Sequence, residues 1–306
     1  MKRAILHTPV LRSVASGCLA LLAIAGTTPA LAADVVTIAG TGAGGYSGDR
    51  GPATAARLAS PHGMAVAANG TVYVADSDNY RVRRIGTDGV ITTIAGNGSF
   101  GDDGDGGQAT SASLSGVLSI ALSPAGDILY ISDIDNNRVR QVNLTTGLIT
   151  NFAGAGWVGA GFGGDGGPAT SASLATPEGV AVDSSGNVYI GDLFNCVVRM
   201  VDAATGVIST VAGVPGACSP GGDGGDALSA QFSLPRRMAL DAAGNLFVLD
   251  SGSRTVVPFT GLTIMCRLAS AITGRFVPAI ISSSSFATRS PVSHASRDGI
   301  AFGSTE

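Results

Sequence analysis

A short phrase built from glycine and aspartate occurs four times in this chain of 306 residues. The copies read GDRGPAT, GDGGQAT, GDGGPAT and GDGGDAL, and they begin at Gly48, Gly104, Gly164 and Gly222. Each copy places at least one carboxylate in a glycine-rich loop. Such a carboxylate can accept backbone hydrogen bonds in a bend, cap a short helix or bind a hard cation such as calcium.

The glycine-aspartate phrases belong to a longer repeated unit of about 58 residues. Each unit also contains a tetrapeptide related to TIAG and a segment related to GMAVAANGTVYVADSDNYRVRRI, which begins at Gly63. Self-similarity at a fixed period of this length indicates a repeat architecture. Runs of β-branched and aromatic residues between turn pairs such as Asn69-Gly70 predict four short strands per unit. In the first unit these strands are predicted over Met64–Ala67, Thr71–Ala75, Arg81–Ile85 and Val90–Ala95.

Short antiparallel strands in a repeated unit are typical of propeller blades. We therefore predict an all-β fold, a β-propeller of four-stranded antiparallel blades, of which the sequence encodes about four. A parallel β-helix is disfavoured because its coils are shorter and lack regular hairpin turns. The expected organisation is a signal peptide over 1–32, the propeller over 33–259 and an irregular serine-rich tail over 260–306.

Four blades are compatible with three forms of the propeller: a closed four-bladed ring, an open arc, or the remnant of a longer propeller. An open arc would leave two exposed sheet edges, and exposed edges pair readily with other chains. We therefore expect self-association if the propeller is open.

The N-terminus reads as a secretory signal. Basic residues precede a short apolar run, and Ala30-Leu31-Ala32 offers a cleavage site after Ala32. We expect an exported protein, periplasmic or extracellular, that is not an integral membrane protein after cleavage; the alternative is an uncleaved membrane anchor. Cys196, Cys218 and Cys266 would remain. A bridge between Cys196 and Cys218 and a set of isolated thiols are both compatible with this spacing.

The composition narrows the class of partner. The chain has 45 glycines, 13% charged residues and a net charge of −4. We see no basic run, so a nucleic-acid partner is not expected. Of the 22 acidic residues, 20 are aspartates, which favour turns and helix caps over helix surfaces.

The segment from Pro61 to Val82 has the pattern P-x-G-x-A-V…G-x-V-Y-V-A-D-S-x-N-x-R-V. It resembles the NHL repeat, and the longer unit with TIAGTG and GDGGPAT is similar to the NHL segments of teneurin-like and bacterial exported proteins. The resemblance covers about Val35 to Phe259. It implies a propeller, commonly closed with six blades, in a family whose members bind proteins, RNA or peptides and include a few lyases.

The NHL-type lyases hold a metal with several histidines. After removal of the predicted signal peptide this chain keeps only His62 and His294. It also lacks the G-x-S-x-G pattern of a serine nucleophile. We therefore predict that the protein is not an enzyme and needs no metal or other cofactor, with calcium at the aspartate-rich loops as the rival hypothesis.

The strand order places two sets of aspartates on one face of the disc, which we call the loop face. We interpret them first as structural residues of turns and caps. In the glycine-rich loops an aspartate would cap a one-turn helix that has Pro52 or Pro168 at its first position. At the end of each second strand an aspartate would accept backbone N–H groups. The two sets are Asp49, Asp105, Asp165 and Asp223, and Asp76, Asp133, Asp192 and Asp250.

Positions that differ between aligned units are not dictated by the scaffold. Those on the loop face are candidate binding residues, although such variation is also what unconstrained loops show. They are His62, Glu178, Arg236, Asp78, Tyr80, Asp135, Phe194 and Trp157. The sequence thus predicts a binding module for a protein, peptide or glycan. The alternatives are a cell-surface structural scaffold and an NHL-type lyase or hydrolase.

Overall fold

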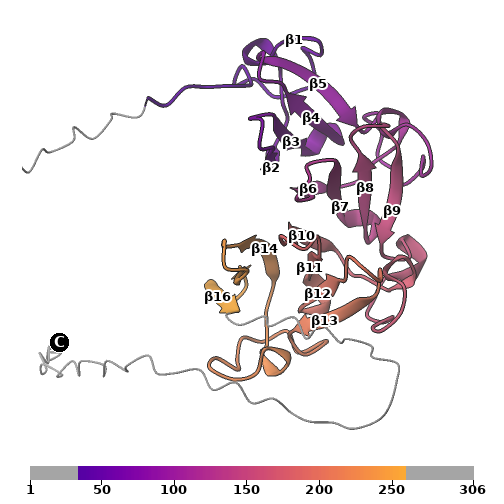
Figure 1. Cartoon of the computed structure of the whole chain (residues 1–306), viewed down its shortest axis with the longest axis vertical. Coiled ribbons are helices and arrows are strands. Elements are labelled where there is room, and N and C mark those ends of the chain that lie inside the picture. Colours follow the sequence, from indigo (N-terminus) through magenta and orange to yellow (C-terminus); the bar gives the residue numbers. More distant parts are fainter. Residues whose placement is uncertain (1–33, 260–306) are drawn as a thin grey trace, which may run out of the picture. The chain divides into compact units, whose positions relative to one another are not determined.

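A computed structural model describes residues 34–259, and these residues form four antiparallel sheets (Figure 1). Blade 1 contains β1 (Gly51–Pro52), β2 (Pro61–Val66), β3 (Val72–Asp76), β4 (Arg81–Ile85) and β5 (Val90–Ala95). Blade 2 contains β6 (Val117–Leu122), β7 (Ile128–Asp133), β8 (Arg138–Asn143) and β9 (Ile149–Ala153). Blade 3 contains β10 (Pro177–Val182), β11 (Val188–Asp192), β12 (Val197–Val201) and β13 (Ile208–Ala212). Blade 4 contains β14 (Pro235–Leu240), β15 (Leu246–Asp250) and β16 (Thr255–Phe259).

The prediction of an all-β propeller with four blades is confirmed. Consecutive strands pair in antiparallel fashion, as expected for segments joined by tight turns such as Asn69-Gly70. Three details differ from the prediction. Blade 1 has a fifth strand, because β1 pairs with β5. The first strand begins at Pro61 and not at Met64, because a bulge between these residues lets its early part pair with Asp76. Blade 4 has three strands within residues 34–259, and any continuation lies outside the described residues.

Eight short 3₁₀ helices lie in the connections of the described region. Three of them follow the second strand of a blade: η2 (Ser77–Asn79), η4 (Ile134–Asn136) and η7 (Leu193–Asn195). Four follow the glycine-aspartate phrases, and η5 lies in the link between blades 2 and 3: η1 (Ala53–Ala55), η3 (Ala109–Ser111), η6 (Ala169–Ser171), η8 (Ala227–Ser229) and η5 (Trp157–Gly159). None of these helices is long and apolar enough to cross a bilayer.

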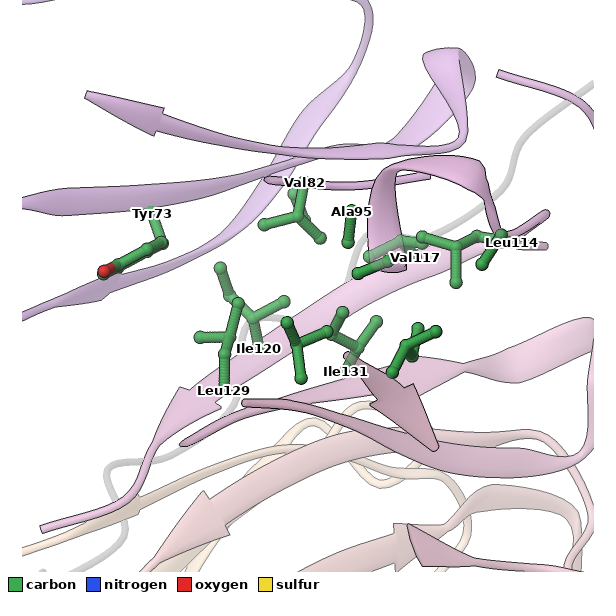
Figure 2. Packing of buried hydrophobic residues seen from close by; sticks show 13 residues of the cluster. Tyr73, Val82, Ala95, Leu114, Val117, Ile120, Leu129 and Ile131 are labelled. Atoms are coloured by element: carbon green, nitrogen blue, oxygen red, sulfur yellow. The ribbon is translucent and has the colours of Figure 1, made fainter. Parts of the chain in front are cut away.

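Each blade packs its apolar face against the next blade. Tyr73 and Val82 of blade 1 lie opposite Ile120, Leu129 and Ile131 of blade 2, and all five are buried (Figure 2). Similar clusters join blade 2 to blade 3 and blade 3 to blade 4. Successive residues of a strand point to opposite faces, so each inner blade contributes to two of these interfaces.

One large side chain from each connecting segment fills the space between neighbouring blades. Leu114, Leu174 and Phe232 occupy these positions and are almost fully buried. The corresponding residue before blade 1, Leu58, is only partly buried, because no blade precedes it in the described region.

A disulfide joins Cys196 to Cys218, with their Cα atoms 5.3 Å apart. Of the two possibilities that the sequence left open, the structure has the bridge. Cys266 lies outside the described residues, as do the predicted signal peptide and the serine-rich tail.

Candidate functional site

The aspartates at the ends of the second strands are buried. Asp76, Asp133 and Asp192 each accept a hydrogen bond of 2.7 Å from a backbone N–H of the preceding connection. Each also accepts one from an asparagine three residues later, over 2.8 to 3.0 Å. Asp250 of blade 4 accepts from the N–H groups of Ser233 and Leu234. These contacts hold the connecting loops against the blades.

Three fully buried arginines link the two sets of aspartates, and sequence reasoning missed them. Arg83 donates to Asp76 at 3.1 Å and to Asp49 at 2.7 Å. Arg140 and Arg199 stand at the same place in blades 2 and 3, and each lies between the equivalent two carboxylates. We call each such group an arginine clamp.

The signal for the clamps was available in the sequence. An arginine stands seven residues after the strand-end aspartate in the first three units, at Arg83, Arg140 and Arg199. In blade 4 the residue at that position is Val257. The aspartate of the last phrase, Asp223, is accordingly exposed and has no guanidinium partner within residues 34–259.

The predicted helix caps are wrong for Asp49, Asp105 and Asp165. The 3₁₀ helices that follow them have no side-chain cap, and Pro52 and Pro168 lie at the N-cap position instead of the first helical one. The physical reason is the arginine clamp, since a buried guanidinium needs a counter-charge and takes these carboxylates. In the last unit Asp226, and not Asp223, caps η8 by accepting from the N–H of Leu228 at 2.8 Å.

Burial shifts the acidity of the strand-end aspartates. It raises the pKa of Asp192 to about 7, although Asn195 and the N–H of Ala175 donate hydrogen bonds to the carboxylate. Burial likewise raises the pKa of Asp133 to about 6. The pKa of Asp49 is lowered overall. Burial alone would raise this pKa, but hydrogen bonds from Thr93 and Tyr46 and the positive charge of Arg83 outweigh the effect of burial.

The candidate binding residues have different environments. Most are available on the surface, namely His62, Asp78, Asp135, Phe194 and Trp157. Tyr80 is partly buried, adopts a left-handed conformation and contacts Phe100 edge to face.

Glu178 was expected on an exposed rim, and this expectation is wrong, because only 3% of the residue is exposed. It accepts from Arg236 Nη1 at 2.8 Å and lies 3.8 Å from Arg237 Nη2. Arg237 in turn donates to the carbonyl of Leu118 in blade 2 at 2.7 Å. This ion pair joins the innermost strands of blades 3 and 4, so neither Glu178 nor the paired end of Arg236 is free for a ligand.

A groove of 490 Å³ brings two of the candidates together between blades 2 and 3. Asp135 and Trp157 lie in its wall, while His62 and Phe194 do not. The lining residues are Phe100, Ile134, Asp135, Asn137, Trp157 and Thr176. Phe100 and Trp157 are 58% and 64% exposed, so two large apolar rings are open to solvent at one groove.

The polar groups of the groove have defined positions. The Oγ of Ser115 donates to Asp135 at 3.0 Å, and the N–H of Thr176 donates to the side-chain oxygen of Asn137 at 2.8 Å. A carboxylate and an amide fixed beside two aromatic rings can bind a ligand that has both an apolar side and hydrogen-bond donors.

A metal centre finds no support in the described region. Within residues 34–259 no three side chains of histidine, cysteine, aspartate or glutamate gather in a way that could hold an ion. The calcium hypothesis for the aspartate-rich loops stays a prediction, although Asp105 already faces two guanidinium groups.

Comparisons with known proteins agree with the repeat and the fold. Residues 30–103 and 159–220 match the family described as the Teneurin NHL domain. Teneurin-m of Drosophila melanogaster is 34% identical over 175 residues, which cover 53% of this chain and 6% of that protein. Human Teneurin-4 is 29% identical over 267 residues, which cover 74% of this chain and 9% of that protein. The chain thus spans less than a tenth of the length of these relatives.

Among solved structures, an auxiliary nutrient binding protein from Bacteroides ovatus superposes with a TM-score of 0.50. The sequences are 18% identical, and the match covers 66% of this chain and 49% of that one. This likeness shows the fold alone. The repeated units, the four antiparallel blades and the teneurin matches together make the chain similar to the NHL-repeat β-propellers.

Proposed function

We propose that the protein is an exported binding module that holds a polypeptide partner in the groove between blades 2 and 3. One observation carries the proposal: Phe100 and Trp157 stand exposed beside the carboxylate of Asp135 and the amide of Asn137. Exposed aromatic residues around fixed polar groups are typical of the energetic centres of protein interfaces. The NHL family supports an interaction or scaffold role in general terms.

The exported location is part of the proposal. The predicted cleavage site after Ala32 supports it, and so does the disulfide between Cys196 and Cys218. Such bridges persist mainly in oxidising compartments. Mass determination of the protein recovered from the medium or periplasm tests this part, since a retained N-terminus would contradict it.

The groove is tested by panning a random peptide library displayed on phage against the full chain, with a glycan array as a parallel arm. We expect selected peptides to lose at least tenfold in affinity on Trp157→Ala or Asp135→Ala. Val158→Ala is the matched control, because Val158 is next to Trp157 in the chain, fully exposed and outside the groove. Peptides that bind all three variants equally would contradict the proposal, and binding confined to glycans would replace its ligand class.

The scaffold alternative makes a different prediction. A structural element needs no loop-face ligand, so neither library would give binders that depend on Trp157. An NHL-type lyase would hold a metal, so stoichiometric zinc in the purified exported protein would revive the enzyme alternative.

A further inference from the structure

The first and last blades each have an apolar face that no other blade covers. We call Leu58, Met64 and Val66 on blade 1 the leading face, and Ala239, Phe247, Leu249 and Val256 on blade 4 the trailing face. Met64 is 70% exposed, whereas its equivalents Ile120 and Val180 are 5% exposed. Val256 is 60% exposed, whereas its equivalents Val82, Val139 and Val198 are fully buried. At the inner interfaces the same positions therefore form the contact between blades.

Residues Val35–Ala39 have the sequence of a blade's fourth strand but belong to no sheet in the described region. They read VVTIA and are followed by Gly40, as VITTIA of β5 is followed by Gly96. The hydrogen bonds agree with this equivalence. The N–H of Gly40 donates to the carbonyl of Ala53 at 2.9 Å, and Gly96 donates in the same way to Ala109. The segment is therefore joined to blade 1 in the same way as β5 is joined to blade 2. Even so, Val35, Val36 and Ile38 are exposed.

In the described residues, blade 4 has no counterpart of the strand that this segment resembles. Its outer strand β16 has a free edge within residues 34–259, where β4, β8 and β12 are each paired with a fourth strand. A free edge presents unpaired N–H and C=O groups. Within residues 34–259 there is thus a fourth-strand sequence outside any sheet at one end and a three-stranded blade at the other.

We propose that copies of this chain associate head to tail, with Val35–Ala39 of one copy added to the edge of β16 in the next copy. The leading face of the first copy then covers the trailing face of the second. The contact would reproduce the packing between blades 1 and 2 that Figure 2 shows. Two copies that exchange strands in this way leave neither end face exposed.

The register follows from blade 1. There Arg83 is paired with Thr93, and Ile85 with Ile91. The same register places Thr37 of one copy beside Val257 of the next, and Val35 beside Phe259. Pro258 has no amide hydrogen, so the ladder on β16 has one donor fewer than the ladders of the inner blades.

A second copy is a better occupant than the same chain. The exposure of Met64 and Val256 in the single chain shows that its own end faces do not cover each other. The residues that follow β16 begin TGLTIM and lack the TIAG phrase, whereas Val35–Gly40 contains it. Closure within one chain and coverage by the tail are the two outcomes that the experiments must distinguish.

Light scattering after size exclusion tests the association on the full exported chain. We expect a mass near twice that of one chain at tens of micromolar, and one chain mass for Val256→Asp or Met64→Lys. Mixing these two variants should restore the larger mass, because in the mixed pair one interface is unaltered and the other joins the new aspartate to the new lysine. Val158→Asp, on neither end face, should behave as the unaltered protein. A constant mass of one chain overturns the proposal, and so does a mixture that stays monomeric.

Cross-linking tests the register without altering the end faces. Cys266 is replaced by serine in both proteins, and a chain with Thr37→Cys is mixed with a differently tagged chain with Val257→Cys. Under mild oxidation we expect a disulfide between the two tags, while Thr145→Cys in place of Val257→Cys should give none. A chain that carries both Thr37→Cys and Val257→Cys is oxidised in parallel. A bridge that forms only within this doubly substituted chain would show closure within one copy, and the absence of any bridge would favour the tail; both overturn the proposal. The groove between blades 2 and 3 takes no part, so the proposed function stands or falls separately.

Discussion

Arg83, Arg140 and Arg199 are completely buried, although guanidinium groups are strongly hydrated in water. Each is held by one carboxylate from its own blade and one from the glycine-rich loop before that blade. In the first three units the glycine-aspartate phrase is therefore explained by the counter-charge that its loop brings to a buried arginine. Most of the repeated aspartates are thus engaged in the scaffold and not available for a ligand.

Removal of one clamp arginine should be strongly destabilising. Arg83→Met keeps most of the side-chain volume but leaves Asp76 buried without its charged partner. We expect a loss of about 3 to 5 kcal/mol in the free energy of unfolding, the usual cost of breaking a buried pair. Urea denaturation measures it, and Arg84→Met is the matched control, because Arg84 is the next residue and is partly exposed. Equal losses in the two variants would contradict the clamp.

The strand-end aspartates should also make stability depend on pH. Asp192 has a pKa of about 7 in the folded protein against 3.8 for an ordinary aspartate, because burial disfavours its charge. Between these values the unfolded chain binds fewer protons than the folded one. The free energy of unfolding therefore falls as pH rises from about 4 to 7, by up to about 1.4 kcal/mol per pH unit for this group.

The contribution of Asp192 is measured against Asp192→Asn, which cannot ionise. We expect urea midpoints of the unaltered protein to fall relative to those of the variant between pH 4 and pH 7. Asp78→Asn, at an exposed carboxylate, should show no such relative change. Parallel pH profiles for the unaltered protein and Asp192→Asn would show that burial does not shift this group.

At the scale of the element, each fourth strand in the described region is followed by a glycine that the next connection requires. Gly96 has a φ of +87°, and a Cβ added there would lie 2.1 Å from the carbonyl oxygen of Tyr80. Gly154 and Gly213 have the same conformation and similarly close backbone neighbours. The glycine of the TIAG phrase is therefore required both by its backbone conformation and by the close approach of the third strand.

The two requirements can be separated by substitution. Gly96→Ala should reduce the free energy of unfolding more than Gly89→Ala, by about 1 to 3 kcal/mol for the overlap. Gly89 is the matched position, because its φ is +74° and a Cβ there would have no neighbour within 4 Å. Thermal or urea unfolding gives the comparison. Similar losses for the two variants would mean that conformation alone explains the conserved spacing of this glycine within the four units.

At the scale of the whole molecule, stability should follow the number of neighbours that a blade has. Blades 2 and 3 are packed on both faces, whereas blade 4 has three strands in the described region and one uncovered face. In repeat proteins each unit is stabilised by its intrinsic contacts and by the interfaces with its neighbours. We therefore expect blade 4 to open before the rest of the propeller.

Hydrogen exchange followed by mass spectrometry measures this order. In Met64→Lys, which should keep copies apart, peptides from β7, β8, β11 and β12 should exchange slowest and peptides from β15 and β16 fastest. The reason is that local opening costs least where few apolar contacts are lost. Uniform protection across the four blades would contradict a stepwise propeller and indicate one cooperative unit.

The sequence by itself determined the repeat, the four strands of each unit and the propeller class. These features are local, because strand periodicity and turn residues such as Asn69-Gly70 act within a few positions of each other. The same local reasoning placed Asp135 and Trp157 among the candidates, since their positions vary between units. It also identified Cys196 and Cys218 as a possible pair, although it left the isolated thiols equally open.

Only the tertiary structure decided which of these residues are free. Arg83 and Asp49 meet across 34 positions of the chain, and Glu178 and Arg236 across 58. Such pairings depend on how a loop packs on its blade and how one blade packs on the next, and not on neighbouring residues. This is why Asp49 was mistaken for a cap and Glu178 for a surface group. The two uncovered end faces have the same origin, because the positions of Met64 and Val256 are buried in every inner blade and exposed only where the stack stops.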